Sequence, residues 1–365
     1  MKTHLPEGFT ARPGRMEDLT SAVDMFNRCS MEMIGVEEFN GPEIEIEWKS
    51  PGLNQQTDQL VILAPGGELV GFIEVWTDHD VPVHPWVWGR VDPDHKGLGI
   101  GTYLLEWAEE RSRQVLDTVP KSARVSFRCG AFDKFAPSND LLTGYGMEMI
   151  RHNFRMVIHM ENAPPEPVWP EGIMLRAYDH PNEAFSRAIF KADDEAFQDH
   201  FGYVEGDLDK EYERYMYFFT QDESFDPDLW FIAMDRDEVA GISLCRKWAY
   251  GDKDMGWVSS LAVRRPWRKR GIGLALLHRS FGVFWVTWGL QKGHCRKSFA
   301  SGGACGSESV PASFSSIRLK AIRQVRAVIG LVRISMGRST ICPKGSTNLA
   351  DTDWLLNVSI EGPAV

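Results

Sequence analysis

The chain has 365 residues, of which 43% are hydrophobic and 25% are charged, and its formal net charge is −11 at pH 7. This length accommodates about two domains of typical size, and the composition is that of an ordinary globular protein. The acidic excess argues against a general nucleic-acid binder, which would carry a basic face.

Targeting signals and metal motifs are not recognisable in the sequence. The first eight residues lack the apolar core of a signal peptide, and the longest apolar stretch, 281–290, is too short to span a bilayer. The six cysteines show neither CxxC pairs nor zinc spacing, so we interpret them as free thiols without a structural metal. We expect a cytoplasmic protein that binds neither a membrane nor nucleic acid.

The first half of the chain predicts an alternation of strands and helices. A first strand at 8–13 is followed by a helix over 16–29, a hairpin over 61–73 and a strand over 86–91. After a glycine-rich turn come a helix from Thr102, a strand over 123–129, a helix near 139–147 and a last strand over 152–160. We assign residues 1–162 to this domain.

The second half repeats this order. A stiff linker over 163–171 separates the halves, because its closely spaced prolines can continue neither a helix nor a central strand. The repeat then gives a strand at 172–177, a helix over 182–197, a hairpin over 231–243 and a strand over 257–263. We expect this second domain core to cover residues 172–290.

Two similar glycine-rich segments, 91–101 and 263–273, are the most informative motifs. Each lies between a predicted strand and a predicted helix, and each combines cationic side chains with alternating glycines. Backbone N–H groups at a helix N-terminus and glycines that permit close approach are suited to a pyrophosphate. Neither segment is a Walker loop or a G-x-G-x-x-G dinucleotide motif.

These segments resemble the Q/R-x-x-G-x-G/A motif of the GCN5-related N-acetyltransferase (GNAT) superfamily. The second, Arg268-x-x-Gly271-x-Gly273, matches fully; the first has Lys96, which lacks the forked geometry of arginine. The resemblance implies an α+β fold of two tandem domains, each with a mixed, mostly antiparallel sheet flanked by helices. Residues 5–285 are similar to tandem acetyltransferases of the mycothiol synthase type, in which the first half is usually degenerate.

The resemblance implies acetyl-CoA as co-substrate and an amine as acceptor. The expected acetyl-CoA-binding residues belong to the strand before each turn and to the turn itself. In the second half they are Leu261, Ala262, Val263, Arg268, Arg270, Gly271, Ile272 and Gly273; in the first they are Val91, Lys96, Gly97, Gly99 and Gly101, with Gly89 and Arg90 on the same strand.

Acetyl transfer also needs groups that handle protons. Glu195 and His200 are the candidate catalytic residues for accepting the proton of the amine, although both residue types are also common on surfaces. Family members often carry a tyrosine that protonates the departing CoA thiolate. Leu142 takes its place in the first half, and Tyr145 falls on another helix face.

Residues after about 286 are atypical. Residues 287–365 hold 10 Lys+Arg against 4 Asp+Glu, and no strand or tyrosine-bearing helix is recognisable after the second turn. Residues 291–365 are interpreted as a divergent or disordered tail, or as the product of a frameshift near residue 292. We therefore predict an acetyl-CoA-dependent N-acetyltransferase for a small-molecule or peptide amine, with a non-catalytic acyl-CoA-binding protein as the alternative.

Overall fold

The structure, a computed structural model, describes residues 3–77, 81–120, 122–150, 155–160, 162–200, 202–249, 252–287, 298–302, 317–322 and 333–335. The chain divides into two compact units. One unit is Met1–Met149 with Val204–Asp222, and the other is mainly Ile150–Tyr203 with Glu223–Gln324. Each unit is built on one mixed sheet with helices packed on it, as the sequence predicted.

The sheet of the first unit has the order β1-β2-β3-β4-β5. Its strands are β1 (Thr10–Pro13), β2 (Gln59–Leu63), β3 (Leu69–Trp76), β4 (Trp86–Val91) and β5 (Arg128–Cys129). All neighbours are antiparallel except β4 and β5, which pair in parallel. The predicted hairpin is β2–β3, whereas the strand predicted over 123–129 is reduced to the two residues of β5.

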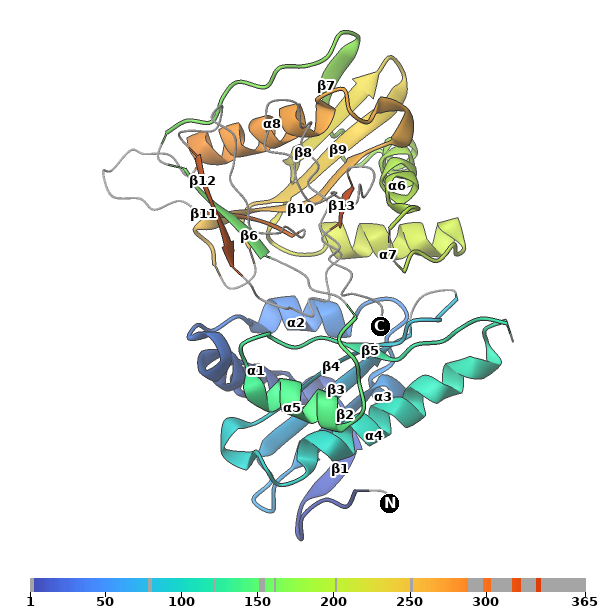
Figure 1. The fold of residues 1–365 in the computed structure, drawn as a ribbon, viewed down its shortest axis with the longest axis vertical. Helices are drawn as coiled ribbons and strands as arrows, with labels where there is room; N and C mark the ends of the chain where they lie inside the picture. Colours follow the sequence, from blue (N-terminus) through green and yellow to red (C-terminus); the bar gives the residue numbers. More distant parts are fainter. Residues whose placement is uncertain are drawn as a thin grey trace, which may run out of the picture. The chain divides into compact units, whose positions relative to one another are not determined.

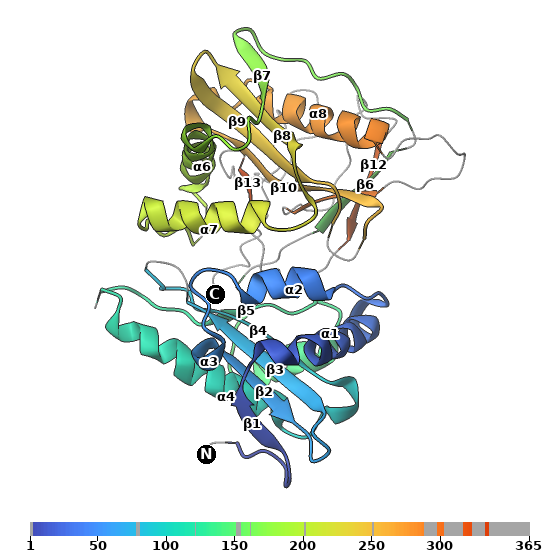
Figure 2. The same cartoon turned by 180° about the vertical axis from the view of Figure 1, so that it is seen from behind.

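Helices cover both faces of this sheet. They are α1 (Leu19–Ile34), α2 (Gly41–Trp48), α3 (Gln55–Asp58), α4 (Ile100–Arg113) and α5 (Ala136–Gly144), and α7 (Leu208–Thr220) also groups with this unit. α1 buries Ala22, Met25, Phe26 and Cys29 at helical spacing, and Phe26 contacts Phe72 of β3. Figure 1 shows α4 and α5 in front of the strands, and Figure 2 shows α1 in front of the opposite face.

The sheet of the second unit has the order β12-β6-β11-β10-β9-β8-β7, with β13 also pairing β10. Its strands are β6 (Arg155–Met160), β7 (Ile173–Ala177), β8 (Phe225–Asp235), β9 (Glu238–Arg246), β10 (Met255–Val263), β11 (Ser298–Gly302), β12 (Ile317–Ile322) and β13 (Arg333–Ser335). The helix α6 (Glu183–Phe197) begins at Asn182, whose side chain accepts the Phe185 N–H, and α8 (Ile272–Thr287) follows the second glycine turn.

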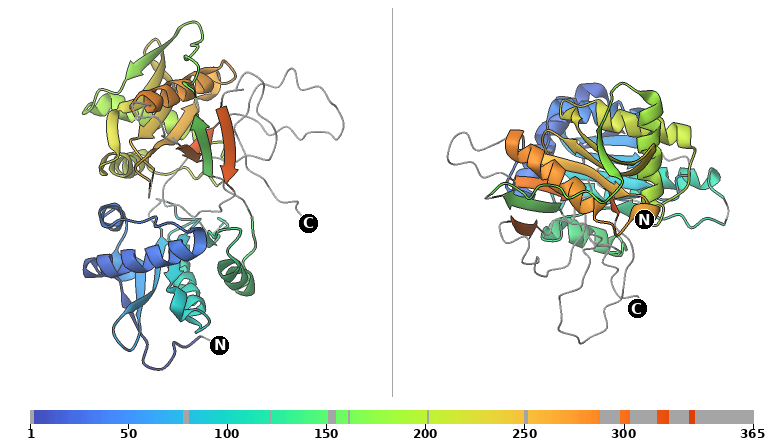
Figure 3. Two further views of the ribbon diagram at one scale, coloured as in Figure 1. Left: turned by 90° about the vertical axis from the view of Figure 1, so that its left-hand side faces the viewer. Right: turned by 90° about the horizontal axis from the view of Figure 1, so that it is seen from above.

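Strand β6 differs from its predicted place. Residues 152–160 were expected to close the first sheet, but β6 pairs antiparallel with β11 and β12 of the second sheet. Figure 3 shows β6 and β12 side by side. Ile158 and Met160 are buried in the core of the second unit, so tertiary burial decides which sheet this strand joins. The boundary at 163–171 stays a prediction.

The segment after α8 also differs from the prediction. No strand was recognised there, yet β11, β12 and β13 form on the edges of β6 and β10. These segments are strands because they pair with neighbouring strands, although their local sequence shows no strand pattern. The rest of 291–365, with the proposed frameshift position near residue 292, lies outside the described residues. Within the described part, no helix is long and apolar enough to cross a membrane.

Candidate functional site

The two glycine-rich turns have the same backbone course. Gly97 and Gly99 take φ values of 79° and 80°, and the equivalent Lys269 and Gly271 take 63° and 87°. Each turn ends in a helix, where Gly99 accepts from Tyr103 N–H and Gly271 from Ala275 N–H, both at 3.0 Å. The first N–H groups of α4 and α8 therefore lack intrahelical acceptors and are suited to an anion.

Strand β4 has a free edge next to the first turn. Its parallel pairing with β5 covers only Trp86 and Val87, and within the described residues Gly89–Val91 have no partner strand on that side. Gly89 is required for the opposite pairing, because a Cβ there would lie 2.8 Å from the Phe72 carbonyl oxygen. This free, splayed edge consists of the β4 residues that the family resemblance implies for acetyl-CoA binding.

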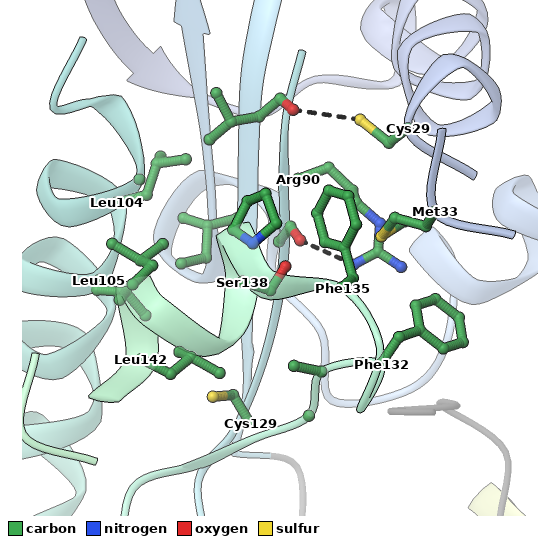
Figure 4. Close-up of a pocket in the computed structure, with 18 of the residues that line it drawn as sticks. Cys29, Met33, Arg90, Leu104, Leu105, Cys129, Phe132, Phe135, Ser138 and Leu142 are labelled. Carbon is green, nitrogen blue, oxygen red and sulfur yellow. Dashed lines mark hydrogen bonds between the residues drawn. The ribbon is translucent and has the colours of Figure 1, made fainter. Parts of the chain in front are cut away.

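A cavity of about 160 Å³ opens at this edge. Its wall combines α1, β4, the turn, α4, the segment after β5, and α5, and Figure 4 shows many of these side chains. Most of the lining is apolar, including Leu104, Leu105 and Leu142. The polar groups are few, and among them the Arg90 guanidinium donates to the Gly89 carbonyl at 3.0 Å. Such a wall suits a narrow, mostly apolar ligand.

The helix α5 supplies no phenol to the cavity. Leu142 lines it, whereas Tyr145 is not part of its wall and donates to Glu109 of α4 at 2.6 Å. Burial and the Glu109 carboxylate raise the pKa of Tyr145 above its usual range, so this phenol is a weak acid. Asn139 shapes the loop before α5 by donating to the carbonyls of Phe132, Asp133 and Phe135.

Two thiols also line the cavity, and sequence reasoning did not place them there. Cys29 donates to the Val91 carbonyl at 3.3 Å, and Cys129 lies 3.6 Å from the Met147 sulfur. Burial raises the pKa of each thiol to about 11, so both are protonated at neutral pH and behave as apolar wall groups. Among the described cysteines, Cys29, Cys129 and Cys245 are free thiols.

The cations of the turns are held by acidic partners. Lys96 pairs with Glu32 of α1, and its amine lies 5.7 Å from the centre of the Phe135 ring. Arg268 forms a forked pair with Asp199 at 2.6 and 3.2 Å, and it also donates to the carbonyls of Val263 and Ala196. The hydrogen bonds from Arg268 hold the pKa of Asp199 below its usual range.

Arg270, the other arginine of the second turn, has different partners. It donates to the Glu171 carbonyl at 3.1 Å, and its guanidinium is 3.8 Å from the Asp235 carboxylate. Trp169, also in the predicted linker, packs against the core of the second unit. The end of the linker therefore lies against the second turn.

The two candidate bases occupy different surroundings. Glu195 is ion-paired with Arg264, Oε2 to Nε, at 2.6 Å, so its carboxylate is engaged by another side chain of the same unit. His200 follows α6 and packs edge-to-face on Phe197. The buried positions of α1 and α6 coincide when residues 22–30 are aligned with 189–197. On this alignment His200 corresponds to Met33 and Asp199 to Glu32, and both of these first-half residues line the cavity.

Strand β10 is interrupted by one extra residue, whereas β4 is regular. Its register with β9 shifts between Val258 and Ser260, so Ser259 forms a β-bulge, whereas β3 and β4 pair without interruption. Bulges redirect side chains and are frequent beside active sites. The predicted ligand strand Leu261–Val263 follows at once, but Ser260–Ala262 also pair with β13 in the structure.

A buried polar pair was missed by sequence reasoning. Ser260 donates to Asp193 of α6 at 2.8 Å, and the two residues are 0% and 2% exposed. The signal in the sequence was the serine pair at 259–260, which interrupts an otherwise apolar strand. By the repeat, Phe26 and Trp88 take the equivalent places in the first half.

Sequence comparison matches the Acetyltransferase (GNAT) family at residues 22–123 and 186–297, one match in each half. The chain therefore belongs to the GNAT acetyltransferase family and carries two tandem copies of its fold. Mycothiol acetyltransferase from Amycolatopsis mediterranei (strain U-32) is 27% identical over 254 residues, which are 67% of this chain and 77% of that protein.

Solved structures agree with the tandem architecture. A GCN5-related N-acetyltransferase from Sphaerobacter thermophilus is 28% identical, with a TM-score of 0.67 over 88% of this chain and 95% of that one. A tandem GNAT protein from the clavulanic acid biosynthesis pathway is 14% identical, with a TM-score of 0.60 over 87% and 97%. At 14% identity, the similarity to this second structure supports the fold and not the activity.

Proposed function

We propose that this protein is an acetyl-CoA-dependent N-acetyltransferase that transfers an acetyl group to a primary amine of a small molecule or peptide. The observation that carries the proposal is the cavity at the splayed edge of β4, which lies beside a glycine turn and a helix N-terminus. Family membership and the acetyltransferase relative support the same reaction class.

The residues at the cavity fit an acyl-CoA in their chemistry. The amides of Gly97, Gly99 and the first turn of α4 would hold the pyrophosphate, because left-handed glycines leave these N–H groups accessible. The free edge at Gly89–Val91 would hold the amides of the pantetheine arm, and the apolar wall would accept its methylene groups.

In the second half the proposed ligand residues are the corresponding ones. Leu261, Ala262 and Val263 lie in β10, and Ile272 begins α8 with its side chain buried. Gly271 supplies the left-handed turn, and Gly273 follows it in the first turn of α8. Because Arg268 and Arg270 are bound to protein carbonyls and carboxylates, we propose that they shape the turn while its backbone amides contact phosphate.

We propose His200 rather than Glu195 as the proton acceptor of the second half. Its first-half counterpart Met33 lines the cavity, whereas Glu195 is engaged by Arg264. The amine nitrogen would form the new bond to the acetyl carbon, the carbon–sulfur bond would break, and the amine proton would pass to His200. The thiolate must then gain a proton from water or from a residue outside the described part.

A non-catalytic acyl-CoA-binding protein is the second candidate. Leu142 in place of a phenol favours it for the first half, and the pairing of β13 with Ser260–Ala262 favours it for the second. Both candidates predict binding of acetyl-CoA, and only the first predicts turnover.

The test is calorimetric titration of the full chain with acetyl-CoA, followed by assay of CoA thiol release with a panel of primary amines. Binding with amine-dependent release that decreases in His200→Ala supports the enzyme. Binding without release for any amine supports the alternative. If acetyl-CoA does not bind, both proposals are wrong.

A further inference from the structure

The start of the first glycine turn is tied to α1 by an ion pair. Arg28 of α1 reaches Asp92, which directly follows β4, at 2.7 Å, and lies 3.8 Å from Glu68 in the β2–β3 hairpin. Asp92 is 2% exposed. Burial alone would raise the pKa of Asp92, but hydrogen bonds from His95 and Arg28 lower it below its usual value, so it is charged at neutral pH.

The start of the second turn is tied to α6 in the same way. Glu195 of α6 reaches Arg264, which directly follows β10, at 2.6 Å. Arg264 also pairs with Glu238 in the β8–β9 hairpin at 3.2 Å and donates to the Val239 carbonyl at 3.1 Å. The same three elements thus meet in both units.

The two charges of this ion pair between helix and turn are exchanged between the halves. Arg28 corresponds to Glu195 and Asp92 to Arg264, so the arginine lies on the helix in one unit and on the turn in the other. The glutamate of the hairpin is kept, as Glu68 and Glu238. A catalytic carboxylate that accepts a proton cannot be replaced by an arginine, whereas an ion pair needs only opposite charges on its two sides.

A second ion pair follows four residues later, and in both units its acidic residue is on the helix side and its basic residue is in the turn. Glu32 of α1 holds Lys96, and Asp199 holds Arg268. Arg28 and Glu32 of α1 are four residues apart, and so are Glu195 of α6 and Asp199, which lies two residues beyond the end of that helix. The turn positions, 92 and 96 or 264 and 268, have the same spacing. The two ion pairs therefore hold both ends of the segment that leads into the left-handed residues.

We infer that the pairs Arg28–Asp92 and Glu195–Arg264 are positioning residues for the acyl-CoA turns. They fix each turn against the first helix of its unit, so that the N–H groups of the turn are aligned before the ligand binds. Glu195 then serves binding through Arg264 and takes no part in proton transfer. This inference rests on the proposed function for its ligand, but the ion pairs also determine the order of the turn without any ligand.

The second half gives the cleaner test, because Arg264 does not cap its turn with its side chain, whereas Asp92 does. The variants are Glu195→Arg, Arg264→Asp and the double variant, which copies the arrangement of the first half. The readouts on the full chain are hydrogen exchange of the amides in 268–273, the KM for acetyl-CoA and kcat. Glu183→Arg, which removes an exposed i,i+4 pair with Arg187, is the control.

Each single variant is expected to speed amide exchange of the turn and to raise the KM by about tenfold with little change in kcat, and the double variant to recover most of both, since coupled charges are non-additive. A double variant no better than the singles would overturn the inference. A fall in kcat that the double variant does not restore would instead make Glu195 catalytic. If wild type does not bind acetyl-CoA, the proposed function fails, while amide exchange still tests the ion pairs.

Discussion

The two halves place the same backbone around different interiors. On the face covered by the first helix, the first unit buries an aromatic pair, Phe26 and Trp88, edge-to-face at 4.7 Å. The second unit buries the hydrogen-bonded Asp193 and Ser260 at the equivalent places. The aromatic pair shows that this fold does not require polar groups there. A buried carboxylate without a structural need is the kind of feature that function retains.

The opposite face shows the same difference. Ile73 of β3 and Ala108 of α4 correspond to Ser243 of β9 and Ser280 of α8, whose hydroxyls hydrogen-bond at 2.8 Å. The reverse also occurs: Glu74 is buried in the first unit, where it accepts from the buried Gln59, and it corresponds to Leu244 in the second. At these two pairs of positions the first unit packs apolar side chains, whereas the second holds hydrogen-bonded polar ones on both faces of its sheet.

The largest effect we expect is on acetyl-CoA affinity, when a valine replaces the left-handed glycine of one turn. Gly271→Val and Gly99→Val should each lower acetyl-CoA affinity at their own half by more than about tenfold, because a side chain blocks the approach of the backbone and strains a left-handed residue by about 1–2 kcal/mol. Calorimetric titration measures both effects. Gly67→Val in the β2–β3 hairpin, also left-handed with φ 86°, is the control for strain alone. Equal affinity in all three variants would place the ligand elsewhere.

Variants at Arg268 and its partner test whether this arginine shapes the turn or contacts the phosphate of acetyl-CoA. Arg268→Ala should weaken acetyl-CoA binding by about 1–3 kcal/mol, and Lys96→Ala by less, because Arg268 makes more hydrogen bonds within its unit. Titrating the Asp199→Asn variant with acetyl-CoA distinguishes the two roles of Arg268. Weaker binding means that Asp199 supports the turn, whereas tighter binding means that it competes with phosphate for Arg268.

The buried polar pair can be converted to an apolar one. Ser260→Ala should lower the free energy of unfolding by about 1–3 kcal/mol, because it removes a hydrogen bond from the buried Asp193. Asp193→Leu combined with Ser260→Ala should cost less than the single change, since an apolar pair replaces both partners. Urea denaturation measures both. A double variant less stable than the single one would show that Asp193 supports the fold by other contacts.

Glu74 gives an effect on stability that depends on pH. Burial raises its pKa to about 7 from an ordinary 4.5. The folded state then binds more protons than the unfolded one between these values, so the free energy of unfolding falls as pH rises from about 4.5 to 7. Glu74→Gln should stabilise the protein by about 1–3 kcal/mol at pH 8 and hardly at pH 4. The same gain at both pH values would contradict a protonated Glu74.

The sequence was sufficient for what local backbone geometry determines. The turns at Gly99 and Gly271 could be placed because cationic side chains and alternating glycines lie between a strand pattern and a helix pattern, and the hairpins followed from apolar runs around polar turns. The partners of Arg268 and Glu195 could not be predicted, because they lie about 70 residues away and meet only through packing. The sheet that receives β6 was also unpredictable, since its strand pattern fits either one.

Strand β6 limits where the gene for this two-domain chain could be divided without breaking a domain. The strand precedes the linker in the chain but completes the sheet that follows it. A gene fragment that began at the linker would encode a second sheet without one of its inner strands, and β11 and β12 would lose the strand between them. Recombination that exchanged halves at the linker would therefore exchange incomplete sheets, whereas a junction before residue 150 would keep the second one whole.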